Sequence, residues 1–101
     1  MFVYNITLKI ETKYLEEWMD WVKTVQIPDI IATGCFYDFR FYELIEIEED
    51  DGRTFVLQFL ANSKSNYNRY KEIHHSSFRL RSVAKWQDHV VSFRTLLKNV
   101  E

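Results

Sequence analysis

The first third of the chain changes from a strand-like to a helix-like pattern. Residues 2–10 alternate apolar and polar side chains, a period of two that is typical of a β-strand with one buried face. After Thr12, a candidate N-cap, apolar residues recur at helical spacing as far as Val25. Pro28 disfavours helical geometry at the residue before it, so we expect the helix to stop or kink there. A second short helix should end at Gly34.

The rest of the chain predicts three more strands and one more helix. Residues 35–47 are rich in aromatic and β-branched side chains, which favour a long strand. Asp50-Asp51-Gly52 is a hairpin signal, and residues 54–61 predict the returning strand. Helical spacing of apolar residues follows, before residues 89–98 alternate again as a last strand. The predicted order is therefore β-α-β-β-α-β.

This order is the split βαβ arrangement of a ferredoxin-like α+β domain. Two right-handed crossovers would place both helices on one face of a four-stranded antiparallel sheet, with residues 1–101 as a single domain. The opposite face would then be left open, and a monomer would expose more apolar surface than soluble monomers usually do. We therefore expect a homodimer whose sheets pack face to face and close an α+β barrel. The apolar positions expected on the open face are Val3, Phe36, Tyr42, Leu44, Val56, Leu60, Val90 and Leu96.

Composition narrows the class of protein. With 101 residues, 2 Gly and 1 Pro, the chain is too short for two domains and too poor in helix and strand breakers for a disordered protein. The single Cys35 excludes an intrachain disulfide and a multi-cysteine metal site, and it suits a reducing compartment. No secretory signal pattern is present, and no apolar run approaches the roughly 20 residues of a membrane span. We expect a cytoplasmic protein with no membrane partner.

The strand order also occurs in RNA-recognition modules, which makes nucleic acid a class to test. The third strand of those modules needs a basic residue, a glycine and then alternating aromatic residues. Here Asp51 replaces the basic residue, and Arg53 and Gln58 replace the aromatic ones. The net charge of −2 adds no general attraction to polyanions. We expect no nucleic-acid partner.

Charged residues are unevenly distributed. Residues 43–51 are mostly acidic, and residues 64–85 carry many basic side chains against the single acid Glu72. The simpler interpretation is a solvated hairpin tip and a solvated helix face, while the alternative is attraction between the two regions or to a partner. We expect the turn between Glu48 and Arg53 to be the most mobile loop of the domain.

Several short motifs resemble a small bacterial family of about this length that is classed as a domain of unknown function. The motifs are Ile27-Pro28-Asp29, Ala32-Thr33-Gly34 and Phe93-Arg94-Thr95-Leu96-Leu97, and the resemblance covers nearly the whole chain. It implies a dimeric α+β barrel of the ferredoxin-like group, and it implies no activity because that family has none assigned. Members often carry His where this chain has Gln26, which weakens an acid–base role for the adjacent Ile-Pro-Asp motif.

One polar cluster is expected on the open sheet face, where strand alternation places one or two polar residues on every strand. Charged groups on an otherwise apolar, covered face need partners. One interpretation is a network that fixes the packing of the dimer, and another is a site where guanidinium groups bind a small anionic ligand. A third is that the face is simply solvated. The members are Asn5, Asp38, Arg40, Gln58 and Arg94.

A second candidate site lies between the helices and the sheet, where barrel monooxygenases hold their ligands. Trp21, Asp29 and His74 are the candidate residues for this pocket. His74 and His75 diverge by about 100° on a helix and cannot bind one metal ion together, so we expect no metal and no cofactor. The leading interpretation is a homodimer with a structural or small-ligand-binding role. The alternative is a small oxygenase-like enzyme that uses this pocket.

Overall fold

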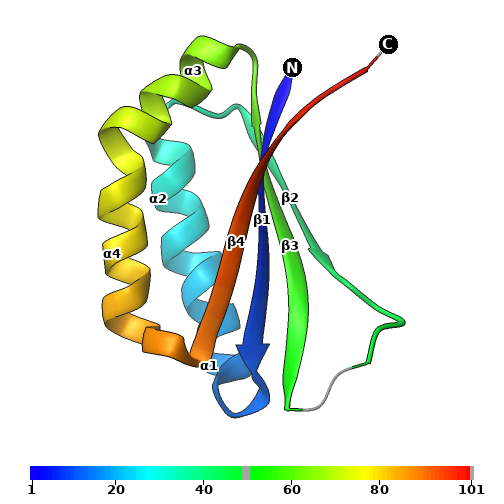
Figure 1. The fold of residues 1–101 in the computed structure, drawn as a ribbon. Coiled ribbons are helices and arrows are strands. Elements are labelled where there is room, and N and C mark those ends of the chain that lie inside the picture. Colours follow the sequence, from blue (N-terminus) through cyan, green and yellow to red (C-terminus); the bar gives the residue numbers. More distant parts are fainter. Residues whose placement is uncertain (49–50, 101) are drawn as a thin grey trace.

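The computed structural model describes residues 1–48 and 51–100 (Figure 1). Its strands form one antiparallel sheet in the order β2-β3-β1-β4, which is the ferredoxin-like order that the sequence predicts. Both helical regions cover the same face of the sheet, and the other face has no cover (Figure 1). The strands are β1 (Phe2–Glu11), β2 (Asp38–Glu43), β3 (Gly52–Ala61) and β4 (Val90–Lys98).

The first helical region stays helical through Pro28. A short 3-10 turn (Thr12–Tyr14) leads into α1 (Leu15–Trp21), a π-helical segment (Val22–Gln26) and α2 (Ile27–Ala32). In the π-helical segment the N–H of Ile27 bonds to the carbonyl of Val22, so the chain changes hydrogen-bond register just before proline, which has no N–H. Of the two outcomes expected at Pro28, the stop is wrong, because the chain changes its type of helix there and continues into α2.

The end of α2 is placed correctly by the sequence. Gly34 has a φ of 76°, a left-handed conformation that glycine adopts without steric cost, and it follows the last turn of the helix.

The second helical region has the same construction. It consists of α3 (Lys64–Arg69), a second π-helical segment (Tyr70–His74) and α4 (His75–Trp86), and a 3-10 turn (Gln87–His89) then leads into β4. The side chain of Ser63 caps α3 by accepting a hydrogen bond of 3.1 Å from the N–H of Asn66. Each long helix thus contains one wider turn.

The core fills the space between helices and sheet. Alternate residues of β1 and β3 point into it, and Trp18 and Phe59 are essentially buried, with 1% and 0% exposure. Phe36 belongs here as well: it lies before β2, is 4% exposed and stacks on Tyr4 at 6.0 Å. The expectation that Phe36 lies on the open face is wrong, because the chain has not yet entered the strand at that point.

The faces of β4 are the reverse of the prediction. Arg94 pairs with Ile6, and Thr95 pairs with Asn5. Because Ile6 is a core residue, Arg94 lies on the helix-covered face, together with Val90, Ser92 and Leu96. Their neighbours Val91, Phe93, Thr95 and Leu97 occupy the open face. Both faces of β4 carry apolar residues, so alternation alone does not show which face is covered.

The acidic hairpin is only partly described. β2 ends at Glu43, earlier than the predicted end at residue 47, and β3 begins at Gly52. Glu49 and Asp50, on which the expectation of a mobile turn rests, lie outside the described residues.

Candidate functional site

The most polar part of the helix-covered face is a chain of three side chains. Nε of Arg94 on β4 donates a hydrogen bond of 2.6 Å to the hydroxyl of Tyr4 on β1. The same hydroxyl lies 3.4 Å from Nδ1 of His75, the first residue of α4. Tyr4 is 3% exposed, so this connection between sheet and helix is made inside the domain.

Tyr70 completes the group. It comes from the π-helical segment that precedes α4, is 2% exposed, and its ring lies 5.4 Å from that of Tyr4 and 6.4 Å from that of His75. The wider turn begins at this residue, so the local change of helix geometry accompanies the placement of Tyr70 and His75 over the sheet.

Two cavities flank these four residues. One has a volume of about 50 Å³ and extends under both helices to Trp21 and Gln26. The other has a volume of about 90 Å³ and extends toward Tyr67 and Lys71. The residues that line both cavities are Tyr4, Tyr70, His75 and Arg94.

The charge of the cavity walls is one-sided. Arg94 and Arg79 line the first cavity, and Arg94 and Lys71 line the second. The lining residues, all in the described part of the chain, include no Asp and no Glu. Such a wall favours an anionic occupant.

The protonation equilibria of the site follow from burial and from these cations. Burial raises the pKa of Tyr4 to about 12, although Arg94 opposes the shift. Burial also raises the pKa of Tyr70. The pKa of His75 is lowered, first by burial and then by the positive charges of Arg94, Arg79 and Lys71. At neutral pH the tyrosines are therefore protonated and the imidazole is largely neutral.

The polar cluster predicted for the open face is divided by the structure. Asn5, Gln58 and Arg40 lie side by side on neighbouring strands, and Thr95 extends this row onto β4. Gln58 donates a hydrogen bond of 3.1 Å to Asn5, and Asn5 donates one of 3.2 Å to Thr95. Arg94 is not part of this row.

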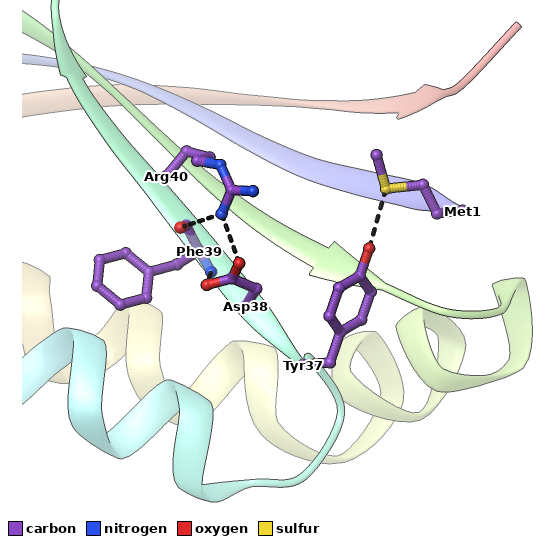
Figure 2. A network of polar contacts seen from close by, with 5 residues as sticks. All are labelled: Met1, Tyr37, Asp38, Phe39 and Arg40. Carbon is purple, nitrogen blue, oxygen red and sulfur yellow. Dashed lines mark hydrogen bonds and ion pairs between the residues drawn. The ribbon is translucent and has the colours of Figure 1, made fainter.

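Asp38 and Arg40 form an ion pair along β2 (Figure 2). Nη1 of Arg40 lies 2.6 Å from the carboxylate of Asp38 and 3.0 Å from the carbonyl of Phe39. Alternate residues of a strand are about 6.5 Å apart, a spacing that favours a partner for Arg40 on another strand or subunit. Instead, the guanidinium folds back along its own strand, and the two side chains remain 46% exposed.

Of the three residues predicted for the pocket between helices and sheet, only one lines the cavities. Trp21 lines the smaller cavity as expected. Asp29 lies outside both linings and pairs with Arg81 at 2.7 Å. His74 stacks on Tyr70 at 6.1 Å, and the adjacent His75 is the histidine in the cavity walls.

Sequence patterns gave little indication of Tyr4, Tyr70 and His75. The two tyrosines occupy apolar positions of their elements and are indistinguishable there from core aromatic residues. Their one distinguishing feature is that a tyrosine carries a hydroxyl, which usually needs a hydrogen-bond partner when it is buried.

The described residues contain neither a cluster of metal ligands nor a membrane-spanning helix. In that part of the chain, no group of three or more His, Cys, Asp or Glu residues could hold a metal ion. No helix within residues 1–48 and 51–100 is long and apolar enough to cross a membrane.

Several solved structures share the fold. Two crystal structures of dimeric ferredoxin-like proteins from an uncultured marine organism superpose with TM-scores of 0.72 and 0.75, at 13% and 11% sequence identity. The matches cover 100% and 99% of this chain and 96% and 95% of those chains. A protein from Bacillus cereus, named as a candidate antibiotic biosynthesis monooxygenase, has a TM-score of 0.57 at 10% identity, over 99% of this chain and 95% of that one. At such identities these similarities show the fold alone.

Comparisons by sequence identify the family. No curated protein matches the chain. A family model does: the one described as a domain of unknown function, DUF4286, matches residues 1–100. The resemblance that the motifs indicated is thereby confirmed, and the chain belongs to the DUF4286 family.

Proposed function

We propose that this protein is a homodimer that binds a small organic anion between its helices and its sheet. The observation that carries the proposal is the one-sided charge of the two cavities, whose walls contain Arg94, Arg79 and Lys71 and no acid. An uncompensated guanidinium in a partly buried position is costly, and a bound carboxylate would remove that cost.

Arg94 is the residue best placed to bind the anion. Its Nε is held by Tyr4, and its two Nη groups form no hydrogen bond or ion pair with the described residues. The outer side of a guanidinium offers parallel N–H donors that match the two oxygens of a carboxylate. Tyr4 therefore acts as a positioning residue for a guanidinium that remains free to bind.

The dimer is supported by the open face of the sheet. Tyr42, Val91 and Phe93 are 53%, 62% and 62% exposed on this face, and no helix covers them. Soluble monomers rarely expose a contiguous apolar surface of this kind. Two proteins with this fold are described as dimeric. Sedimentation equilibrium should give about twice the chain mass of 12.3 kDa, and a monomer would refute this half of the proposal.

A thermal-unfolding screen with small carboxylates tests whether the protein binds an organic anion. Small carboxylates should raise the thermal unfolding temperature of the wild type, because a ligand that binds only the folded state stabilises it. Arg94→Met keeps much of the apolar stem and removes the charge, so the shift should disappear. Arg40→Met is the matched control on the open face, and it should keep the full shift. A wild type that responds to no carboxylate would refute anion binding.

An oxygenase-like enzyme is the second candidate. It is favoured by the position of the cavities, between helices and sheet in a fold shared with a candidate monooxygenase. Volumes of about 50 and 90 Å³ leave no room for a flavin or a haem unless the helices move apart. A change in flavin or haem absorbance on mixing with the protein would favour this candidate over the binding protein.

A further inference from the structure

Tyr70 presents an unused hydroxyl inside the domain. The residue is 2% exposed and is surrounded by aromatic rings, with Phe36 at 5.0 Å and Tyr4 at 5.4 Å between ring centroids. Its hydroxyl forms no hydrogen bond with the described residues, and it is not one of their fully buried polar atoms. Because Tyr70 lines both cavities, this hydroxyl is available to donate a hydrogen bond to a molecule bound there.

The polar groups around the cavities differ in whether they can donate or accept a further hydrogen bond. Arg94 offers only donors, and the hydroxyl of Tyr4 is already paired with Nε of Arg94 and with Nδ1 of His75. Tyr70 adds a hydroxyl that has no partner among the described residues, and His75 adds its second ring nitrogen, Nε2. A carboxylate that pairs with the two Nη groups of Arg94 leaves the hydroxyl of Tyr70 available for a further oxygen of the same ligand.

We propose that the anion is a short 2-hydroxy or 2-oxo carboxylate, an inference that rests on the proposed function. Its carboxylate pairs with Arg94, and the oxygen on the adjacent carbon accepts a hydrogen bond from Tyr70. Both residues line both cavities, so one small molecule can reach the two together.

The cavity volumes set the size of the ligand. Spaces of about 50 and 90 Å³ accommodate an acid of a few carbon atoms, since about 10–15 Å³ of cavity volume holds one water molecule. Aromatic rings from Trp21 and Phe78 line the smaller cavity, so a bulky acid would have to displace them. Lactate and pyruvate fit this limit, and benzoate exceeds it.

The experiment is a titration of the wild-type protein by calorimetry with propionate, lactate, pyruvate and benzoate. Lactate and pyruvate should bind about tenfold more tightly than propionate, which has the same carbon chain but no oxygen on the carbon next to the carboxylate. The difference is the hydrogen bond that the hydroxyl of Tyr70 donates to this oxygen. Benzoate should bind more weakly than propionate. Tyr70→Phe should reduce the affinity for lactate and pyruvate to that for propionate, and the control Tyr42→Phe should change nothing.

The outcomes separate the two proposals. Propionate, lactate and pyruvate binding equally to the wild type would overturn the inference and leave anion binding intact. No binding by any acid would overturn the proposed function and the inference with it. A preference for lactate and pyruvate that persists in Tyr70→Phe would also overturn the role of Tyr70. The comparison among acids uses the wild type, so it does not depend on the folding of a variant.

Discussion

Arg94 and Tyr4 meet diagonally across two neighbouring strands. Arg94 on β4 pairs with Ile6 on β1, yet its Nε reaches back to the hydroxyl of Tyr4 at 2.6 Å. Burial raises the pKa of Tyr4 to about 12, so the hydroxyl stays protonated at neutral pH and no phenolate neutralises the guanidinium. The contact therefore orients the positive charge of Arg94 without cancelling it.

Tyr4→Phe should lower the free energy of unfolding by about 1–2 kcal/mol, because it removes the hydroxyl that accepts from a partly buried guanidinium. Urea unfolding measures the change. Tyr37→Phe, at a 52% exposed tyrosine whose hydroxyl contacts the sulfur of Met1, is the control and should stay within about 0.5 kcal/mol of the wild type. Equal effects at the two positions would show that the contact with Arg94 contributes nothing to stability.

The strands and their order could be predicted from periodicity, because a period of two survives in β1 and β3. The face of β4 that the helices cover could not be predicted in this way. Val90 and Leu96 are as apolar as Val91 and Leu97, so only the pairing of Arg94 with Ile6 shows which set faces the helices. For this reason the sequence places Arg94 on the open face, and the pocket that it predicts between helices and sheet, with Trp21 in its wall, lacks this arginine.

The helices show a second limit of sequence patterns. A regular helix does not predict the wider turn at Tyr70–His74. This turn shifts the phase of the residues that follow it, and His75 rather than His74 then lines the cavities. Pro28 likewise predicts that the helix stops or kinks. In the structure, the π-helical segment before Pro28 lets the chain remain helical.

Protonation of His75 should make stability depend on pH. Burial and the charges of Arg94, Arg79 and Lys71 lower its pKa in the folded state, so the unfolded chain takes up the proton first as pH falls. The stability linked to His75 is fully present above about pH 6.5 and is lost as pH falls through the lower, folded pKa. The wild type should therefore lose more free energy of unfolding between about pH 7.5 and pH 5 than His75→Gln does. Urea unfolding at the two pH values measures this loss for each protein. An equal loss in the wild type and in His75→Gln would contradict this assignment.

Arg81 links the two helical regions beside the smaller cavity. It binds Asp29 at 2.7 Å, donates two hydrogen bonds to Gln26, and its guanidinium lies 4.9 Å from the ring centroid of Phe78. Arg81→Met keeps an apolar side chain and loses these hydrogen bonds, and we expect a cost of about 1–2 kcal/mol after allowance for solvent screening of the ion pair. Lys85→Met, on the same helix, is the control. Equal urea midpoints for the two variants would show that Arg81 does not hold the helices together.

Arg40 should matter to assembly rather than to ligand binding. It extends the row of Gln58 and Asn5 on the open face and pairs with Asp38 there. If two sheets pack face to face, Arg40→Met leaves Asp38 in the interface without its partner, and we expect the dimer to dissociate at least tenfold more readily. Sedimentation at several concentrations measures the change, and an unchanged dissociation constant would place the pair outside the interface.

Phe93 gives the sharpest test of which face forms the dimer. It lies on the open face of β4, opposite Thr7, and is 62% exposed in the single chain. In the proposed dimer, Phe93→Glu places an unpaired carboxylate in the interface between the two sheets, so the variant should sediment as a folded monomer of about 12.3 kDa. Leu80→Glu is the matched control, because Leu80 is 64% exposed but lies on α4, on the opposite side of the domain. This second variant should remain a dimer. If Leu80→Glu dissociates the protein and Phe93→Glu does not, the subunits associate through their helices, and the open face of the sheet has some other partner.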